Sequence, residues 1–223
     1  MSKGRLIVIE GIDGSGKSTQ YKMLCARLAS LKIEYRNIVF PRYDRDSSAL
    51  IRLYLSGAFG TNPTDVNAYT ASAFYACDRF ASFKDDWGEY YNNGGLIIAD
   101  RYTTSNAVHQ GTKVPESELE AYLTWLSDLE YDKMGLPRPD MVLYMDCDLE
   151  TSQRRMRHRE AETNTSADIH EKNNAYLAGC FKTAKTACEY YGWTKVPYLT
   201  GEGDEIGAEE KSEIVFNLIK DIL

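Results

Sequence analysis

The segment Gly11–Thr19 limits the possible folds of this chain more than any other part of the sequence. It reads Gly-Ile-Asp-Gly-Ser-Gly-Lys-Ser-Thr and directly follows the apolar run Leu6–Ile9. This is the phosphate-loop pattern G-x-x-x-x-G-K-[ST], which lies between a β-strand and a helix. Its glycines let consecutive backbone N–H groups turn inward at a helix N-terminus, where they bind phosphate. The sequence therefore predicts a strand, a loop and a helix that hold a nucleoside triphosphate.

Two side chains of this loop have expected roles of their own. Lys17 is expected to reach the β and γ phosphates, and the Ser18 hydroxyl is expected to ligate Mg²⁺. The competing interpretation is a chance match in a glycine-rich turn, which the strand before the loop and the helix after it disfavour. The residues expected to contact the triphosphate are Gly11, Ile12, Asp13, Gly14, Ser15, Gly16, Lys17, Ser18 and Thr19.

Length and charge restrict the class of protein. With 223 residues and 43% hydrophobic content, the chain can bury a full core, and residues 1–223 are expected to form a single α/β domain. The net charge of -7 argues against a nucleic-acid partner, since nucleic-acid binding depends on an excess of Lys and Arg. No apolar stretch approaches 18 residues, so neither secretion nor a membrane partner is expected.

The cysteines point to a reducing compartment. They are odd in number and lack C-x-x-C spacing, which is typical of reduced thiols in a cytoplasm. The three histidines are too scattered to complete a zinc site. The cysteines are Cys25, Cys77, Cys147, Cys180 and Cys188.

Strand and helix patterns alternate along the chain. Short apolar runs predict strands over Leu6–Ile9, Tyr35–Phe40, Leu96–Ala99, Met141–Asp146 and Thr194–Leu199. Helical patterns cover Lys17–Leu31, Ser47–Ser56, Val66–Tyr91, Glu116–Lys133, Leu149–Glu162, Ile169–Tyr191 and Glu209–Leu223. This order predicts a doubly wound parallel sheet whose ligands lie beyond the carboxyl ends of the strands.

Arginines follow two of those strand ends. Arg42 follows the second predicted strand and Arg101 follows the third, so both are expected within reach of the phosphate loop. Asp100 is expected to act on the water shell of the metal. The competing interpretation of Asp100 and Arg101 is a surface ion pair, which is common and weak.

Four arginines lie close together in the segment Gln153–Arg159. A solvated helix face is the usual explanation of such a charge run. Because residues 160–167 are polar and poor in apolar anchors, we favour a mobile lid over about 154–168. Lid arginines can neutralise charge on a transferring phosphoryl group and exclude water from it. The arginines are Arg154, Arg155, Arg157 and Arg159.

Taken together, these motifs resemble the thymidylate kinases over nearly the whole chain. The phosphate loop alone is common to many enzymes, but its combination with the other segments is selective. The resemblance rests on Ile9–Thr19, Phe40–Arg42, Tyr75–Arg79, Asp100–Tyr102 with Ser105 and Asn106, and Gly135–Asp140. It implies the P-loop nucleoside monophosphate kinase fold, a five-stranded parallel sheet flanked by helices, in a homodimer. The implied reaction transfers phosphate from ATP to dTMP.

The resemblance also implies roles for individual residues. Tyr75 would stack on thymine, Arg79 would donate to its O4 carbonyl, and Asn106 would face the N3 edge. The competing interpretation of Tyr75 is an aromatic of the helix core, which the resemblance further disfavours. The implied catalytic set is Asp13, Lys17, Arg101, Arg154, Arg155 and Arg159. The implied substrate set is Asp13, Arg42, Tyr75, Arg79, Asp100, Arg101, Ser105 and Asn106, and the implied metal set is Ser18 and Asp100.

The chain departs from the family pattern at three positions. Gly14 stands where some members carry an arginine, so the resemblance assigns transition-state charge to the lid arginines, as in bacterial members. Arg42 directly follows Pro41, whereas other members place the arginine one residue later, at Tyr43 in this chain. His109 stands where members often carry a bulky aromatic near the sugar.

Two other functions remain open from the sequence. One is another nucleotide or deoxynucleoside kinase of the same fold, which the acceptor pocket would decide. The other is a GTP-dependent switch protein, which shares the phosphate loop. The chain has no N-K-x-D segment, and its one D-x-x-G match, Asp85–Gly88, lies in a helical pattern. No general base is required for a kinase of this kind, because an acceptor phosphate is already ionised.

Overall fold

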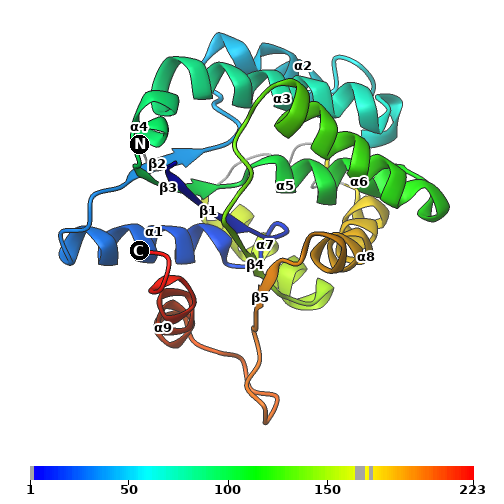
Figure 1. Cartoon of the computed structure of the whole chain (residues 1–223). Coiled ribbons are helices and arrows are strands. Elements are labelled where there is room, and N and C mark those ends of the chain that lie inside the picture. Colours follow the sequence, from blue (N-terminus) through cyan, green and yellow to red (C-terminus); the bar gives the residue numbers. More distant parts are fainter. Residues whose placement is uncertain (1–2, 164–168, 171–172) are drawn as a thin grey trace.

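The computed structural model describes residues 3–163, 169–170 and 173–223, without the side chains of 159–163 and 174. Five strands form one parallel sheet in the order β2-β3-β1-β4-β5. They are β1 Arg5–Glu10, β2 Arg36–Val39, β3 Leu96–Asp100, β4 Met141–Met145 and β5 Thr194–Val196. The predicted five-stranded parallel sheet is confirmed, and helices lie on both of its faces (Figure 1).

The central strand β1 explains why the sheet is covered on both sides. Its side chains alternate between the two faces, and those at positions 6 to 10 are buried. Leu6 and Val8 join one hydrophobic cluster, whereas Ile7 and Ile9 join another. The second cluster packs against α1 (Lys17–Ser30) and α9 (Ala208–Ile219), which lie together on one face (Figure 1).

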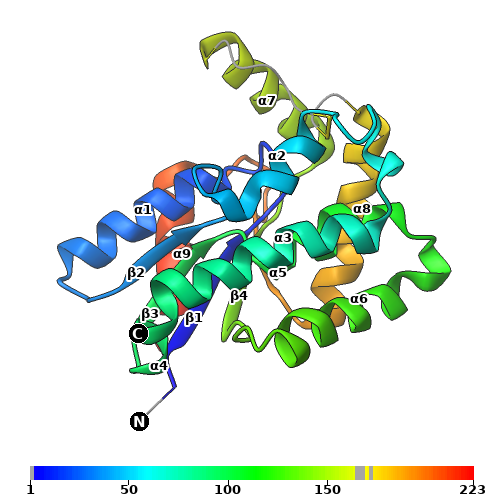
Figure 2. The ribbon, with the colours of Figure 1, turned by 90° about the horizontal axis from the view of Figure 1, so that it is seen from above.

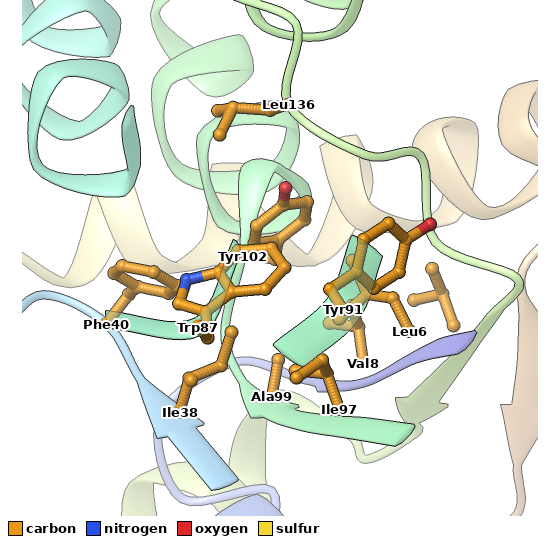
Figure 3. Close-up of a cluster of buried hydrophobic side chains, with 11 residues drawn as sticks. Leu6, Val8, Ile38, Phe40, Trp87, Tyr91, Ile97, Ala99, Tyr102 and Leu136 are labelled. Atoms are coloured by element: carbon orange, nitrogen blue, oxygen red, sulfur yellow. The ribbon is translucent and has the colours of Figure 1, made fainter. Parts of the chain in front are cut away.

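The opposite face is covered by a cluster rich in aromatic side chains. Trp87 is fully buried there, and its ring centroid lies 6.3 Å from that of Tyr102. Figure 3 shows Trp87 between Phe40 and Tyr91, above the strands that carry Ile38 and Ala99. The helix predicted over 66–91 is interrupted where the chain joins this cluster. The observed elements are α3 Ala68–Ser82, a π-helical turn Phe83–Trp87 and α4 Gly88–Asn92.

The remaining helices differ in part from the prediction. They are α2 Ala49–Leu55, α5 Thr103–Ser105, α6 Leu119–Ser127, α7 Leu149–Thr163 and α8 Asn174–Tyr191. Helix α8 begins later than predicted because the Asn173 side chain accepts from the Tyr176 backbone N–H and caps it. The prediction for β5 was three residues too long, since the chain turns after Val196. No described helix has the length and apolar character to cross a membrane.

One helical segment was absent from the prediction. Residues Thr103 to Lys113 form α5, a π-helical turn Asn106–Gln110 and a short 3₁₀ turn. They directly follow β3, so they lie at the carboxyl end of the sheet. Helix α7 projects from the end of the molecule opposite the N-terminus (Figure 2). The D-x-x-G match Asp85–Gly88 falls in the π-helical turn and the start of α4, and so does not follow a strand along the chain.

Candidate active site

The phosphate loop connects β1 to α1 as the sequence predicts. Gly16 precedes α1 with φ of 86°, and Gly14 has φ of 76°. These left-handed conformations favour glycine, because a Cβ atom would be strained there. The loop borders a cavity of about 620 Å³ that lies beside Arg155 and Met156 of α7. The backbone therefore has the form of a phosphate cradle at a helix N-terminus.

Lys17 and Asp100 meet at the base of this loop. The Lys17 Nζ atom lies 3.4 Å from Asp100 Oδ1, and both side chains are nearly buried. Burial lowers the pKa of Lys17, Arg101 lowers it further, and Asp100 opposes both. Asp100 Oδ1 accepts no hydrogen bond from the described residues.

Ser18 is exposed in the phosphate loop and lines the cavity beside it. Within the described part of the chain, no cluster of three or more His, Cys, Asp and Glu could form a closed metal cage. Mg²⁺ bound with a nucleotide needs only one or two protein oxygens, since phosphates and water complete its shell. The residues present, Ser18 and Asp100, therefore fit Mg²⁺.

A second cavity of about 690 Å³ opens next to the loop, at the carboxyl ends of β1, β2 and β3. Its walls combine aromatic rings with amide, carboxylate and guanidinium groups. It contains six of the eight predicted substrate residues but neither Arg42 nor Asp100. The lining residues are Asp13, Phe40, Pro41, Tyr43, Leu55, Tyr75, Arg79, Arg101, Tyr102, Ser105, Asn106, His109, Gln110 and His170.

Arg101 links this cavity to the phosphate loop. It has a positive φ of 68°, and its Nη2 donates to Asp13 Oδ1 at 2.5 Å. Burial lowers the pKa of Arg101, but Asp13 and Glu10 outweigh burial and raise it above the ordinary value. The guanidinium is therefore a fixed cation between the two cavities.

Glu10 was not predicted as a site residue, yet it organises this corner. It is fully buried and accepts hydrogen bonds from Thr104 Oγ1 at 2.5 Å and Ser105 Oγ at 2.7 Å. Its Oε1 accepts from the Gly11 backbone N–H at 2.9 Å. The sequence did contain a signal for Glu10, because it is a charged residue at the end of an otherwise apolar strand. Glu10 thus ties the loop to α5.

Arg79 forms the other wall of the cavity and is held by Glu130. Its Nε and Nη2 donate to the two carboxylate oxygens at 2.6 and 2.5 Å, and its exposed fraction is 1%. Burial lowers the pKa of Arg79, but Glu130 raises it more. Glu130 also accepts from Asn106 Nδ2 at 3.2 Å. Glu130 therefore fixes two predicted base-recognition residues together.

Arg42 is not among the residues that line the cavity. Its Nη1 lies 2.8 Å from Asp85 Oδ1, and its backbone N–H and Nε both contact the Asp78 carboxylate. Tyr43, the next residue, lines the cavity instead. The structure does not bring the Arg42 guanidinium together with the other predicted substrate residues.

Of the predicted lid arginines, Arg155 contacts the phosphate loop. Arg155 Nη1 donates to the Gly14 carbonyl at 3.2 Å, and both Arg154 and Arg155 form ion pairs with Glu205. Arg155 also lines a cavity of about 740 Å³ that adjoins the loop next to α9. The side chain of Arg159 and residues 164–168 of the predicted lid lie outside the described residues.

The fold and the two adjoining cavities define a P-loop nucleoside monophosphate kinase: a phosphate loop on a parallel sheet, with a separate acceptor pocket. The thymidylate kinase family model matches residues 9–195, and the chain belongs to this family. Membership makes it a phosphotransferase with small-molecule substrates and ATP as the phosphate donor.

Individual relatives agree with this assignment. A thymidylate kinase of Prochlorococcus marinus (strain NATL1A) is 28% identical over 217 residues, covering 95% of this chain and 96% of the relative. One from Mycobacterium tuberculosis (strain H37Rv) is 28% identical over 170 residues, covering 75% and 78%. A solved thymidylate kinase from Candida albicans superposes with a TM-score of 0.73 at 22% identity, covering 100% of this chain and 94% of that one.

Proposed function

We propose that the chain transfers the γ-phosphate of ATP to dTMP in the presence of Mg²⁺, giving ADP and dTDP. The observation that carries this proposal is the position of the acceptor cavity next to the phosphate loop. Asp13 belongs to the loop and also lines the cavity, where it accepts a hydrogen bond from Arg101. A monophosphate held by Arg101 would face the γ-phosphate of a nucleotide held by Lys17. Positioning of this kind can supply much of the catalytic effect.

Base recognition follows from the opposite end of the same cavity. Tyr75 offers an aromatic face for stacking, which any base can use. Selectivity must therefore come from donors. Arg79 is held by Glu130 and suits a carbonyl such as thymine O4, whereas the amino group of cytosine would leave a buried donor unpaired.

The chain's own cations neutralise charge during transfer. Lys17 is directed at the phosphates, and Arg155 stands beside the loop at Gly14. Bound Mg²⁺ would supply charge neutralisation at the β and γ phosphates, held by Ser18 and through water by Asp100. The acceptor phosphate is ionised at neutral pH, so no side chain has to remove a proton.

The test is an ADP-release assay with dTMP, dUMP, dCMP, dGMP and AMP as acceptors. We expect the highest kcat/KM with dTMP, a loss of about 10 to 200-fold with dUMP for the missing methyl, and a larger loss with dCMP. Tyr75→Ala should weaken the use of all monophosphates similarly. A wild-type preference for dCMP or a purine monophosphate would replace this proposal with another nucleotide kinase of the same fold. Consumption of the nucleoside triphosphate without any acceptor would contradict the kinase, and a preference for GTP in that reaction would favour the switch protein.

We also propose a cytoplasmic homodimer. Its support is the family resemblance, five cysteines that form no disulfide, and exposed apolar side chains on α2 and α3, including Leu50, Leu53 and Phe80. Sedimentation of wild type and of Leu50→Glu tests the assembly, because a charge at a dimer contact should shift the protein to a monomer. Imaging a fluorescent fusion tests the compartment.

A further inference from the structure

His109 occupies the end of the acceptor cavity nearest the phosphate loop. It belongs to the π-helical turn after α5, and its exposed fraction is 7%. Its ring lies almost parallel to that of His170, with centroids 6.0 Å apart and planes inclined by 8°. Both rings line the cavity, as does Arg101.

Both ring nitrogens of His109 already have neighbours. Nε2 lies 3.1 Å from Arg101 Nη1, and Nδ1 lies 3.7 Å from Cys180 Sγ. A guanidinium has only donors, so Nε2 must accept and carry no proton. The proton then resides on Nδ1 and points at the sulfur. The ring is neutral, which agrees with the burial and the nearby Arg101 that lower the pKa of His109 to about 4.

The contact fixes which donors of Arg101 remain for a ligand. Nη1 is directed at His109 and, at 3.4 Å, at Ser105 Oγ, while Nη2 donates to Asp13. Among the described residues, Nε and one N–H of Nη2 have no acceptor. Adjacent donors of this kind bind two oxygens of a phosphate. The orientation of the guanidinium therefore decides whether they face the cavity.

We propose that His109 is a positioning residue that accepts from Arg101 through Nε2 and so directs the remaining Arg101 donors at the acceptor phosphate. This inference rests on the proposed function for the identity of the acceptor. Because both of its nitrogens are engaged, His109 acts through Arg101 and not by proton transfer to the substrate.

Two amide variants separate the two nitrogens. In His109→Gln the amide reaches the former Nε2 position and can still accept from Arg101. In His109→Asn it reaches only the former Nδ1 position beside Cys180. We expect the Asn variant to raise the KM for dTMP about 10 to 100-fold, the worth of a hydrogen bond to a charged group, with the KM for ATP unchanged. The Gln variant should stay within about fivefold of wild type. Equal losses in both variants, or wild-type kinetics for Asn, would overturn the proposal.

The tautomer of His109 can also be measured in the wild-type protein, so the proposal is tested even if a variant fails to fold. Long-range ¹H–¹⁵N spectra of ¹⁵N-histidine-labelled protein at pH 7, assigned with His109→Gln, should report a neutral ring protonated on Nδ1. An Nε2–H tautomer or an imidazolium would overturn the proposal. This result needs no substrate, so it stays decisive even if dTMP proves not to be the acceptor.

Discussion

The two sides of the active site are built from ion pairs of opposite character. On the acceptor side, Arg79 and Glu130 are almost completely buried and bonded through two hydrogen bonds. On the donor side, Arg154 and Glu205 have side chains that are 57% and 43% exposed. A buried pair is costly to break, whereas an exposed pair contributes little and exchanges partners readily. The acceptor pocket is therefore formed before substrate arrives, while the α7 arginines can leave Glu205 for a phosphate.

Lys17→Ala removes a donor-side cation that is buried like the acceptor side. We expect kcat to fall by about 10³-fold or more with the fold intact, because Lys17 is proposed to bind the transferred phosphate. The coupled ADP-release assay measures the loss, and Lys22→Ala, an exposed lysine in the same helix, is the control. Near-normal turnover in a folded Lys17→Ala protein would remove the phosphate-loop assignment.

Arg155→Ala tests whether the donor-side arginines act only when a nucleotide is bound. We expect kcat to fall by about 10³-fold with a smaller change in dTMP binding, since the charge is needed in the transition state. Arg154→Ala is the matched control, because Arg154 shares Glu205 but does not contact Gly14. Wild-type kcat in alanine variants of all four α7 arginines would favour the solvated helix face.

Arg79→Ala tests how much more a buried ion pair contributes to stability than an exposed one. It leaves the buried Glu130 charge without its partner, so we expect the free energy of unfolding to fall by about 3 kcal/mol or more. Arg138→Ala is the control. Arg138 binds Asp132 with two contacts of 3.0 Å, but both side chains are 54% exposed, and we expect a loss below about 1 kcal/mol. Urea unfolding that gave equal losses would contradict the comparison.

Lowering the pH should have the smallest effect of these changes, a loss of unfolding free energy that arises from two histidines on the acceptor side. Burial lowers the pKa of His109 to about 4 and that of His170 well below its ordinary value, so the unfolded chain binds protons first. The stabilisation is complete above about pH 6.5 and is lost as the pH falls toward 4. From pH 6.5 to 5.5 protonation linked to His109 should cost about 1 kcal/mol of unfolding free energy, and His170 acts in the same direction. Urea unfolding at several pH values should show that His109→Gln loses less unfolding free energy than wild type between pH 6.5 and 5.5, by the amount attributed to His109. The same pH dependence in both proteins would refute the buried neutral ring.

The parts of the site that were predictable from sequence are those with local patterns. The phosphate loop and the strand ends at Asp100 and Arg101 follow from apolar runs and glycine spacing. The segment 103–113 was missed because its Thr, Ser, Asn and His residues have weak helix propensity. Its helical form is stabilised by tertiary hydrogen bonds from Thr103 to Glu130 and from Thr104 to Glu10.

Glu130 and His109 could not be recognised for a related reason. Glu130 lies in a polar helical pattern that is typical of a solvated face, and only the packing of α3 against its segment buries it beside Arg79. His109 and His170 are far apart in the chain, and only the fold stacks their rings. The pairing of Arg42 with Asp78 and Asp85 could not be read from the sequence either, and its contact with the substrate stays a prediction.

The contact between α7 and the phosphate loop also restricts which residues position 14 can accept. Ser152 Oγ donates to the Asp13 carbonyl at 2.6 Å, and a Cβ atom on Gly14 would collide with the Ser152 carbonyl oxygen. An arginine at position 14, as some family members carry, therefore requires α7 to move first. Because Arg155 lies on α7, such a movement also shifts Arg155 relative to the loop. The residue at position 14 and the helix that carries the lid arginines are therefore coupled, so one source of charge cannot be introduced without disturbing the other.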